Sequence, residues 1–355
     1  MLETILERAR WAPSGDNTQP WRFEIAGEDR VVVHGRDTRD TVVYDLDGHA
    51  SQLAIGGLLE TAAIAASVLG RSMRVRALPA PETRPTYELT FVPDPQARPD
   101  PLAAFIETRS VHRRPLSRRP LTAQERRALE ASVASAYGVA WVEGTLGRRA
   151  MARLLFRSAR LRLTTPEAYR VHRSIIAWNA QTSEDRVPDQ ALGVDPMTLR
   201  LMRFALQDWQ RVTFMNRWMA GTWIPRVLMD VLPALHCAAH FALTARQPLT
   251  TVDEHVTAGR AMQRFWLTAT SLGLQLQPEM TPLIFARYAR RGTRFTEVAD
   301  GAPTAAAVDA GLAARFGRDT ADRAFFLGRL GHGPAASARS TRLPLQRLLV
   351  DPSQG

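Results

Sequence analysis

The spacing of apolar residues divides the first third of the chain into regular elements. Between residues 2 and 9 the apolar positions recur at helical spacing, which predicts a helix that ends before Pro13. A segment rich in turn-forming residues follows, from 12 to 21. The next elements are predicted from the same patterns: short strands at 21–25 and 31–34, a long apolar helix at 52–70, and an antiparallel strand pair at 73–78 and 87–92.

A second series of elements follows a proline-rich stretch at 93–101, which is the clearest linker in the sequence. Thr122 and Glu125 have the spacing of a capping box and predict the start of a helix that extends to about 136. The other predicted elements are a helical segment at 102–107, strands at 137–143 and 235–244, a mostly helical region at 147–232, and a long helix at 251–272 that ends at Gly273. The remainder is expected to hold short strands and a C-terminal tail.

The two long apolar helices resemble each other at an offset of 203 residues. Gly56 then aligns with Gly259, Leu69 with Leu272, and both helices end in Leu-Gly. The order of helix, strand, long helix and strands also occurs in both parts of the chain. These matches favour one fold made twice, with a first half at 1–98 and a second half at 99–355 that carries the helical region 147–232 as an insert. The alternative is a chance likeness of two apolar helices.

The basic residues change the picture of the chemistry. The chain has 355 residues and a net charge of +11, and all 46 basic residues are arginine. The absence of lysine excludes a lysine Schiff base and the lysine of a phosphate-binding P-loop. Residues 98–176 hold 16 arginines and six acidic residues, and so carry most of the excess charge. Either this stretch is a solvated surface, or some of its arginines neutralise a phosphate. Nucleic-acid binding is not expected, because no helix-turn-helix, zinc-finger or RNA-binding signature occurs.

The remaining candidate chemistry is sparse. The lone Cys237 is typical of a reducing compartment. His236 and His240 have helical metal-ligand spacing, but no glutamate completes a zincin motif, so no metal is expected. The most apolar stretch, at 227–245, contains Asp230 and Pro233 and is a poor membrane span. We expect a bacterial, cytoplasmic protein that does not associate with membranes.

The segment from 12 to 21, APSGDNTQPW, resembles the A-P-S-x-x-N-x-Q-P-W motif of the nitroreductase superfamily. That resemblance implies an α+β fold with mixed or antiparallel sheets flanked by long helices, and FMN bound at the interface of an intertwined dimer. It also implies that the motif contacts the cofactor through Pro13, Ser14, Gly15, Asn17 and Gln19.

Two basic segments are similar to those with which the superfamily contacts the FMN phosphate. One contains Arg109, Ser110 and Arg113, and the other contains Arg339 and Arg342. The first segment departs from the family pattern, because Val111 stands where a hydroxyl residue is expected, so that Ser110 serves instead or the register differs by one. In the third similar region, after Pro278, the resemblance places the backbone of Met280 and Thr281 near the flavin N5.

In the family dimer one subunit supplies the phosphate arginines and the other supplies the loop. A fused pair would therefore keep one composite FMN site, made from the loop of the first half and the arginines of the second half. The resemblance implies an FMN-dependent oxidoreductase that passes hydride through N5 to or from a small organic substrate, with NAD(P)H as a donor and no catalytic side chain.

Two other readings of the chain remain open. One is a non-catalytic protein that sequesters FMN, with the insert closed over the flavin as a lid. The other is an interaction module that has lost FMN. The insert is either a lid or a subdomain that only packs the core, and the chain is either a monomeric pseudo-dimer or a homodimer.

Overall fold

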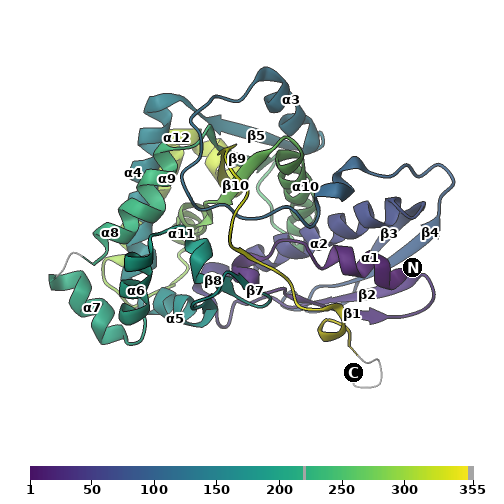
Figure 1. The fold of residues 1–355 in the computed structure, drawn as a ribbon, viewed down its shortest axis with the longest axis horizontal. Helices are drawn as coiled ribbons and strands as arrows, with labels where there is room; N and C mark the ends of the chain where they lie inside the picture. Colours follow the sequence, from purple (N-terminus) through teal and green to yellow (C-terminus); the bar gives the residue numbers. More distant parts are fainter. Residues whose placement is uncertain (219–220, 351–355) are drawn as a thin grey trace.

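The structure, a computed structural model, describes residues 1–218 and 221–350. It has two four-stranded antiparallel sheets, each covered on one side by a long helix, and a group of shorter helices beside the second sheet (Figure 1). The two long helices pack against each other, so the layers run sheet, helix, helix, sheet. The predicted α+β class with antiparallel sheets and long helices is confirmed.

The first sheet and its helices come from residues 1–93 and agree with the predicted elements. Apolar side chains on one face of α1 and nearly all of α2 pack on the sheet, whose strand order is β1-β2-β4-β3. The bounds are α1 Leu2–Ala9, β1 Trp21–Ile25, β2 Arg30–Gly35, α2 His49–Ser67, β3 Arg71–Leu78 and β4 Thr86–Pro93.

The second sheet has the strand order β10-β11-β9-β5. When its elements are matched in chain order to those of the first sheet, β5, β9, β10 and β11 correspond to β1, β2, β3 and β4, and the two sheets have the same order and the same antiparallel pairings. The bounds are α3 Ala123–Ser132, β5 Tyr137–Val142, β9 Ala239–Ala245, α10 Val252–Ser271, β10 Leu274–Pro278 and β11 Ala324–His332.

The two long helices meet at the glycines that the sequence aligns. A Cβ atom added to Gly56 would lie 2.8 Å from the Cα of Gly259, and one added to Gly259 would lie 2.2 Å from the carbonyl oxygen of Leu53. Only glycine lets the two backbones approach this closely. Beside the crossing, Gln263 donates a hydrogen bond of 2.9 Å to Thr61, and Glu60 pairs with Arg260 and Arg264.

Two predicted features of the second half are wrong. The chain after Pro278 does not hold only short strands, because most of residues 280–323 form the helices α11 Met280–Arg291, α12 Gly301–Phe316 and α13 Arg318–Arg323. Glycines in non-helical conformations separate these helices and hide their periodicity. The helix that begins at the capping box ends at Ser132 rather than near 136, because Ala134 has a positive φ of 58°.

The insert lies between β5 and β9 and is mostly helical, as predicted, but it also contains three two-residue strands. It forms the group of helices at the left of Figure 1. Its elements are α4 Gly144–Thr164, α5 Pro166–Ile175, β6 Ile176–Ala177, β7 Thr182–Ser183, β8 Val187–Pro188, α6 Pro196–Ala205, α7 Trp209–Trp218, α8 Trp223–Arg226, a π-helical turn at Val227–Val231, and α9 Leu232–Leu235.

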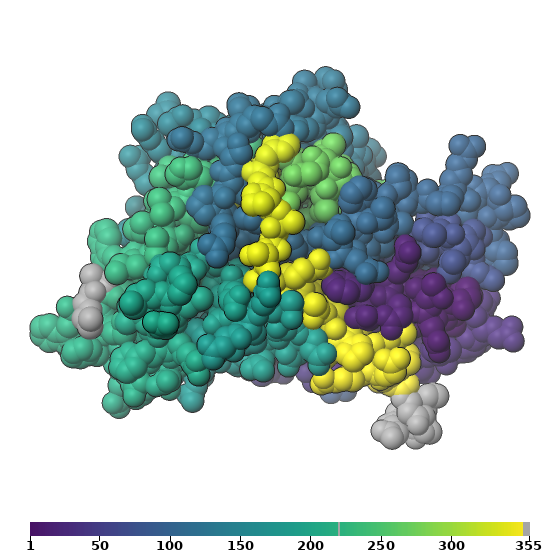
Figure 2. Space-filling model, in the orientation of Figure 1, coloured from purple at the N-terminus to yellow at the C-terminus, as the bar shows by residue number. Residues whose placement is uncertain are grey.

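The C-terminal segment connects the two halves. In Figure 2 it runs over the surface as a yellow band, from the second sheet toward the first. β12 Arg339–Ser340 pairs in parallel with β7, and Leu349 then bridges Phe23 of β1. Leu345 and Leu348 are buried in the core of the first half. Among the described residues, no helix is long and apolar enough to cross a membrane.

Candidate functional site

A cavity of about 530 Å³ lies where the two halves, the insert and the C-terminal segment meet. This volume is within the range of small-molecule and cofactor sites. Eleven of the twelve residues that the sequence predicts as a site line the cavity. These eleven are Pro13, Ser14, Gly15, Asn17, Arg109, Ser110, Arg113, Met280, Thr281, Arg339 and Arg342. The twelfth, Gln19, is buried behind them.

The loop from the first half has an unusual backbone. Asp16, Asn17 and Gln19 all have positive φ angles, of 51°, 63° and 46°. Such conformations are costly for residues other than glycine and are kept where surrounding contacts hold them. Here the hydroxyl of Ser14 accepts a hydrogen bond of 3.0 Å from the backbone N–H of Gln19, which closes the loop.

Asn17 and Gln19 fasten this loop to distant segments. The Asn17 amide donates to the carbonyls of Glu184 and Thr341, at 3.0 and 3.2 Å. The Gln19 amide donates to the same Glu184 carbonyl and accepts a hydrogen bond from the backbone N–H of Leu343. Gln19 is therefore a positioning residue rather than part of the cavity wall. The Asn17 Oδ1 atom is buried and has no hydrogen-bond partner among the described residues.

Three arginines gather around Trp11 at one end of the cavity. The Arg109 Nη2 donates to the Trp11 carbonyl at 2.9 Å, and the Arg342 Nε donates to the Ala12 carbonyl at 2.9 Å. The Arg339 guanidinium lies over the Trp11 ring, 5.2 Å from its centre. None of the three forms an ion pair with another described residue. The Nε atoms of Arg109 and Arg339 are buried and lack a partner within the same residues.

The positive charges of this arginine cluster (Arg109, Arg339 and Arg342) repel one another. Burial, and then the neighbouring Arg342 and Arg339, hold the pKa of Arg109 well below its usual range. Burial, Arg339 and Arg10 lower the pKa of Arg342 to about 9. A guanidinium stays charged in proteins, so the shifts indicate that positive charge is crowded here. Burial also lowers the pKa of Arg339, and the Glu107 carboxylate opposes that effect. A dianion with several acceptor oxygens fits such a place.

Arg113 does not join this cluster, although the sequence groups it with Arg109. Its guanidinium donates to the Ala191 carbonyl at 3.2 Å. Burial lowers its pKa, and the carboxylate of Asp16 opposes that effect. Asp16 is affected in the same way, since burial raises its pKa and Arg113 lowers it. Arg113 thus has an acidic residue of the loop in its surroundings, whereas Arg109 has two further arginines.

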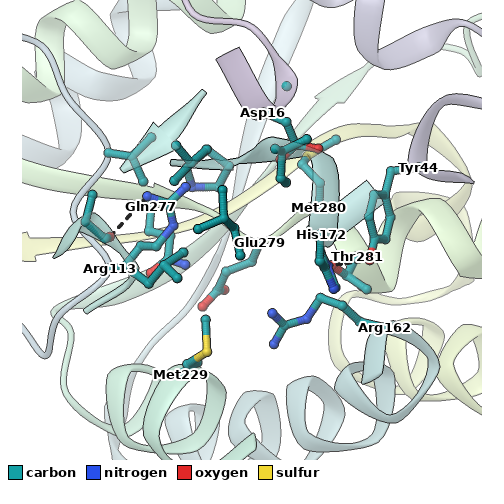
Figure 3. Close-up of a pocket in the computed structure, with 18 of the residues that line it drawn as sticks. Asp16, Tyr44, Arg113, Arg162, His172, Met229, Gln277, Glu279, Met280 and Thr281 are labelled. Atoms are coloured by element: carbon teal, nitrogen blue, oxygen red, sulfur yellow. Dashed lines mark hydrogen bonds between the residues drawn. The ribbon is translucent and has the colours of Figure 1, made fainter. Parts of the chain in front are cut away.

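Met280 and Thr281 begin α11 and line the cavity beside Glu279 (Figure 3). Glu279 is a site residue that the sequence analysis missed. Its carboxylate lies 2.7 Å from the Nδ1 atom of His240, which is completely buried on β9. Burial alone would lower the pKa of His240, but the adjacent Glu279 raises it to about 10. Arg329 on β11 approaches the other Glu279 oxygen at 3.6 Å.

Another part of the cavity wall is formed by the insert and by Tyr44. The Tyr44 hydroxyl lies 3.0 Å from the Nε2 atom of His172 on α5. Burial, with Arg162 nearby, lowers the pKa of His172 to about 3, so this imidazole is neutral at pH 7. Arg162 on α4 pairs with Asp230 at 2.7 Å and points into the cavity (Figure 3). No sequence motif marks these four residues, and the contacts between them form only in the folded chain.

Comparisons with known proteins give weak similarities. No family model matches the sequence, and no curated protein matches it. Among solved structures, the fold is similar to a nitroreductase-like family protein from Bacillus cereus, with 11% identity, a TM-score of 0.36, and coverage of 71% of this chain and 96% of that chain. It is also similar to a nitroreductase with bound FMN from Bacteroides fragilis, with 11% identity, a TM-score of 0.35, and coverage of 66% of this chain and 89% of that chain. A third similar structure is the FMN-dependent nitroreductase NfnB from Mycobacterium smegmatis in complex with NADPH, with 14% identity, a TM-score of 0.38, and coverage of 69% of this chain and 96% of that chain.

Proposed function

We propose that this protein is an FMN-binding oxidoreductase of the nitroreductase type. The observation that carries the proposal is the arginine cluster, in which three buried or half-buried guanidinium groups share one end of the cavity without an ion-pair partner among the described residues. Two of their N–H donors, the Nε atoms of Arg109 and Arg339, have no acceptor within residues 1–218 and 221–350. Burying such donors is costly unless a ligand satisfies them.

The cavity residues fit the parts of FMN. Arg109, Arg339 and Arg342 would hold the phosphate. The loop at Ser14, Gly15 and Asn17 has an unsatisfied amide oxygen for the N–H edge of a flavin ring, and the start of α11 at Met280 and Thr281 forms the facing wall. The flavin, when bound, supplies hydride chemistry at N5. The protein orients the ring, excludes water and leaves room in the cavity for NAD(P)H or a small organic substrate.

We further propose that the chain is an internal duplication, with halves at 1–98 and 99–355. The identical strand order of the two sheets and the meeting of Gly56 with Gly259 support this. The proposed site is composite, because its loop comes from the first half and its arginines from the second. One FMN per chain is therefore expected, in a cytoplasmic protein that works as a monomeric pseudo-dimer.

Comparison of FMN with riboflavin tests the phosphate assignment. Each charge-assisted hydrogen bond to the phosphate contributes about 1.5–3 kcal/mol, which corresponds to about 10- to 100-fold in affinity. FMN should therefore bind at least tenfold more tightly than riboflavin. Arg339→Gln should weaken FMN binding and leave riboflavin binding unchanged, whereas Arg200→Gln, at an exposed position on α6, should change neither. Equal affinity for the two flavins would refute the phosphate site.

A second candidate function is FMN sequestration, which is favoured by the insert helices that line the cavity. Stopped-flow mixing with NADPH and NADH separates the two. Rapid bleaching of the flavin absorbance near 450 nm, followed by its return on addition of an electron acceptor, supports the oxidoreductase. A flavin that stays oxidised with both nucleotides and is released intact on unfolding would support sequestration instead. The same spectrum gives the ratio of flavin to chain, and a ratio of two would contradict the composite site.

A further inference from the structure

Apolar side chains of the insert line part of the cavity, and we call this part the insert compartment. The walls of this insert compartment come from α4, α6, α7 and the π-helical turn. They include Leu155, Met202, Leu206, Val212, Met215 and Met229. Three of the six are methionine side chains, on α6, α7 and the π-helical turn, and methionine adapts to ligands of irregular shape.

The insert compartment reaches the surface. Leu201 and Ile224 line the cavity, yet their exposed fractions are 41% and 53%. Further exposed apolar side chains lie on the same helices α6, α7 and α8: Met197, Phe204, Phe214, Trp218 and Trp223. Such a group of exposed apolar residues is unusual on a protein surface unless something binds there. The wall of the compartment thus continues into an apolar rim.

The inner end of the insert compartment is polar but electrically balanced. Arg162 is paired with Asp230, and the Tyr44 hydroxyl is paired with the neutral His172. These groups offer N–H and O–H donors to a ligand oxygen. An anionic head group would meet the carboxylates of Asp230 and Glu279, so the arrangement favours an uncharged acceptor such as a carbonyl.

We infer that the insert compartment binds an uncharged carbonyl compound with an alkyl chain, the carbonyl at Tyr44 and Arg162 and the chain leading out past Leu201 and Ile224. This assignment names the substrate class of the proposed oxidoreductase. That the bound compound is a substrate rests on the proposed function, whereas its binding does not. The ligand's chain replaces water along the apolar wall, and its oxygen accepts hydrogen bonds at the inner end.

Binding of a homologous series of alkyl phenyl ketones, from acetophenone to decanophenone, tests the inference without any redox step. Burial of one methylene group contributes about 0.8 kcal/mol, or roughly fourfold in Kd. We expect Kd to fall by about this factor per carbon until the chain reaches the rim, and then to level off. Straight-chain carboxylates of equal length should bind at least tenfold more weakly. A Kd independent of chain length, or equal binding of the carboxylates, would overturn the inference.

Two variants of α6 locate the site. Ala205 lines the compartment, so Ala205→Phe should abolish the dependence on chain length. Arg200→Phe places the same side chain on the exposed side of α6 and should leave the dependence intact. Met202→Ala enlarges the compartment, so the Kd should continue to fall up to longer alkyl chains than in the wild type. This variant serves as the test if Ala205→Phe does not fold.

FMN retention is measured in each protein by its absorbance. If wild-type protein retains FMN but binds all ketones alike, only this inference fails. If the chain-length dependence is found in protein that takes up no FMN, only the proposed function fails.

Discussion

The crossing of α2 and α10 can be tested with a single methyl group. A Cβ atom added to Gly56 would lie 1.9 Å from the carbonyl oxygen of Val256 and 2.8 Å from the Cα of Gly259. Both neighbours are backbone of the facing helix and cannot rotate away. The two helices would have to separate locally by about 1 Å or more before the contact became tolerable. Gly56→Ala therefore opens the packed interface on which both halves depend.

The magnitude follows from two opposing effects. Overpacking of a well-packed interior costs about 1–3 kcal/mol, and a gap of 0.5–1 Å removes about a quarter to a half of the dispersion energy of the atoms that face it. Replacing glycine by alanine within a helix returns up to about 1 kcal/mol. With the overpacking cost at the upper end of its range, the expected net loss is about 2 kcal/mol of the free energy of unfolding. Gly259→Ala should behave alike, because its Cβ would lie 2.2 Å from the Leu53 carbonyl oxygen.

Gly57→Ala is the matched control, one residue along the same helix. Its Cβ would lie 3.5 Å from the nearest atom, the Cδ of Pro13, which is an ordinary contact. This variant should be as stable as the wild type or up to about 1 kcal/mol more stable. Urea unfolding followed by circular dichroism at 222 nm measures all three variants. If Gly56→Ala and Gly57→Ala have the same midpoint, the close helix crossing is refuted.

Two further predictions concern pH and helix capping. Because burial lowers the pKa of His172 to about 3, from an unfolded value near 6.5, its contribution to stability is complete above pH 6.5 and is lost as the pH falls toward 3. Urea unfolding between pH 7 and pH 4.5 gives the change of the unfolding free energy with pH. This change should be smaller in His172→Gln than in the wild type, by up to about 1.4 kcal/mol per pH unit. An equal change in both proteins would contradict a buried neutral imidazole at position 172. Thr251→Ala removes the capping box with Glu254 at the start of α10 and should cost about 1 kcal/mol of unfolding free energy, whereas Thr257→Ala, whose hydroxyl donates within the same helix, should cost less.

Local signals in the sequence predicted much of the fold. The capping box at Thr122 identified where α3 begins, and the glycine at Gly273 identified where α10 ends. These features depend on residues that are close in sequence. The helices after Pro278 were not predicted, because Gly292 and Gly317, which have non-helical conformations, interrupt the helical periodicity of this region.

The site was predictable only where a contiguous motif or basic segment marked it. The loop and the arginines Arg109, Arg339 and Arg342 do line one cavity. Other pairs in the cavity wall join residues far apart in the chain, such as Tyr44 with His172 and Arg162 with Asp230. Nothing local indicates such pairs. Arg113 is the opposite case. It stands close to Arg109 in the sequence, but in the folded chain its guanidinium donates to the Ala191 carbonyl instead of joining the arginine cluster.

The two halves differ in ways that bear on how many sites a chain can hold. Between α1 and β1 there are eleven residues, which form the loop of the cavity. The corresponding connection in the second half, between α3 and β5, has four residues and leaves no room for an equivalent loop. The insert likewise follows β5, whereas its counterpart in the first half is the four-residue turn between β1 and β2. Under the proposed duplication, the loop and the insert compartment therefore occur once, on opposite halves, and both face the same cavity. A second equivalent site would lack the loop that fits a flavin ring and the apolar wall that fits an alkyl chain. The expected stoichiometry of one FMN and one carbonyl ligand per chain thus follows from the lengths of two connections.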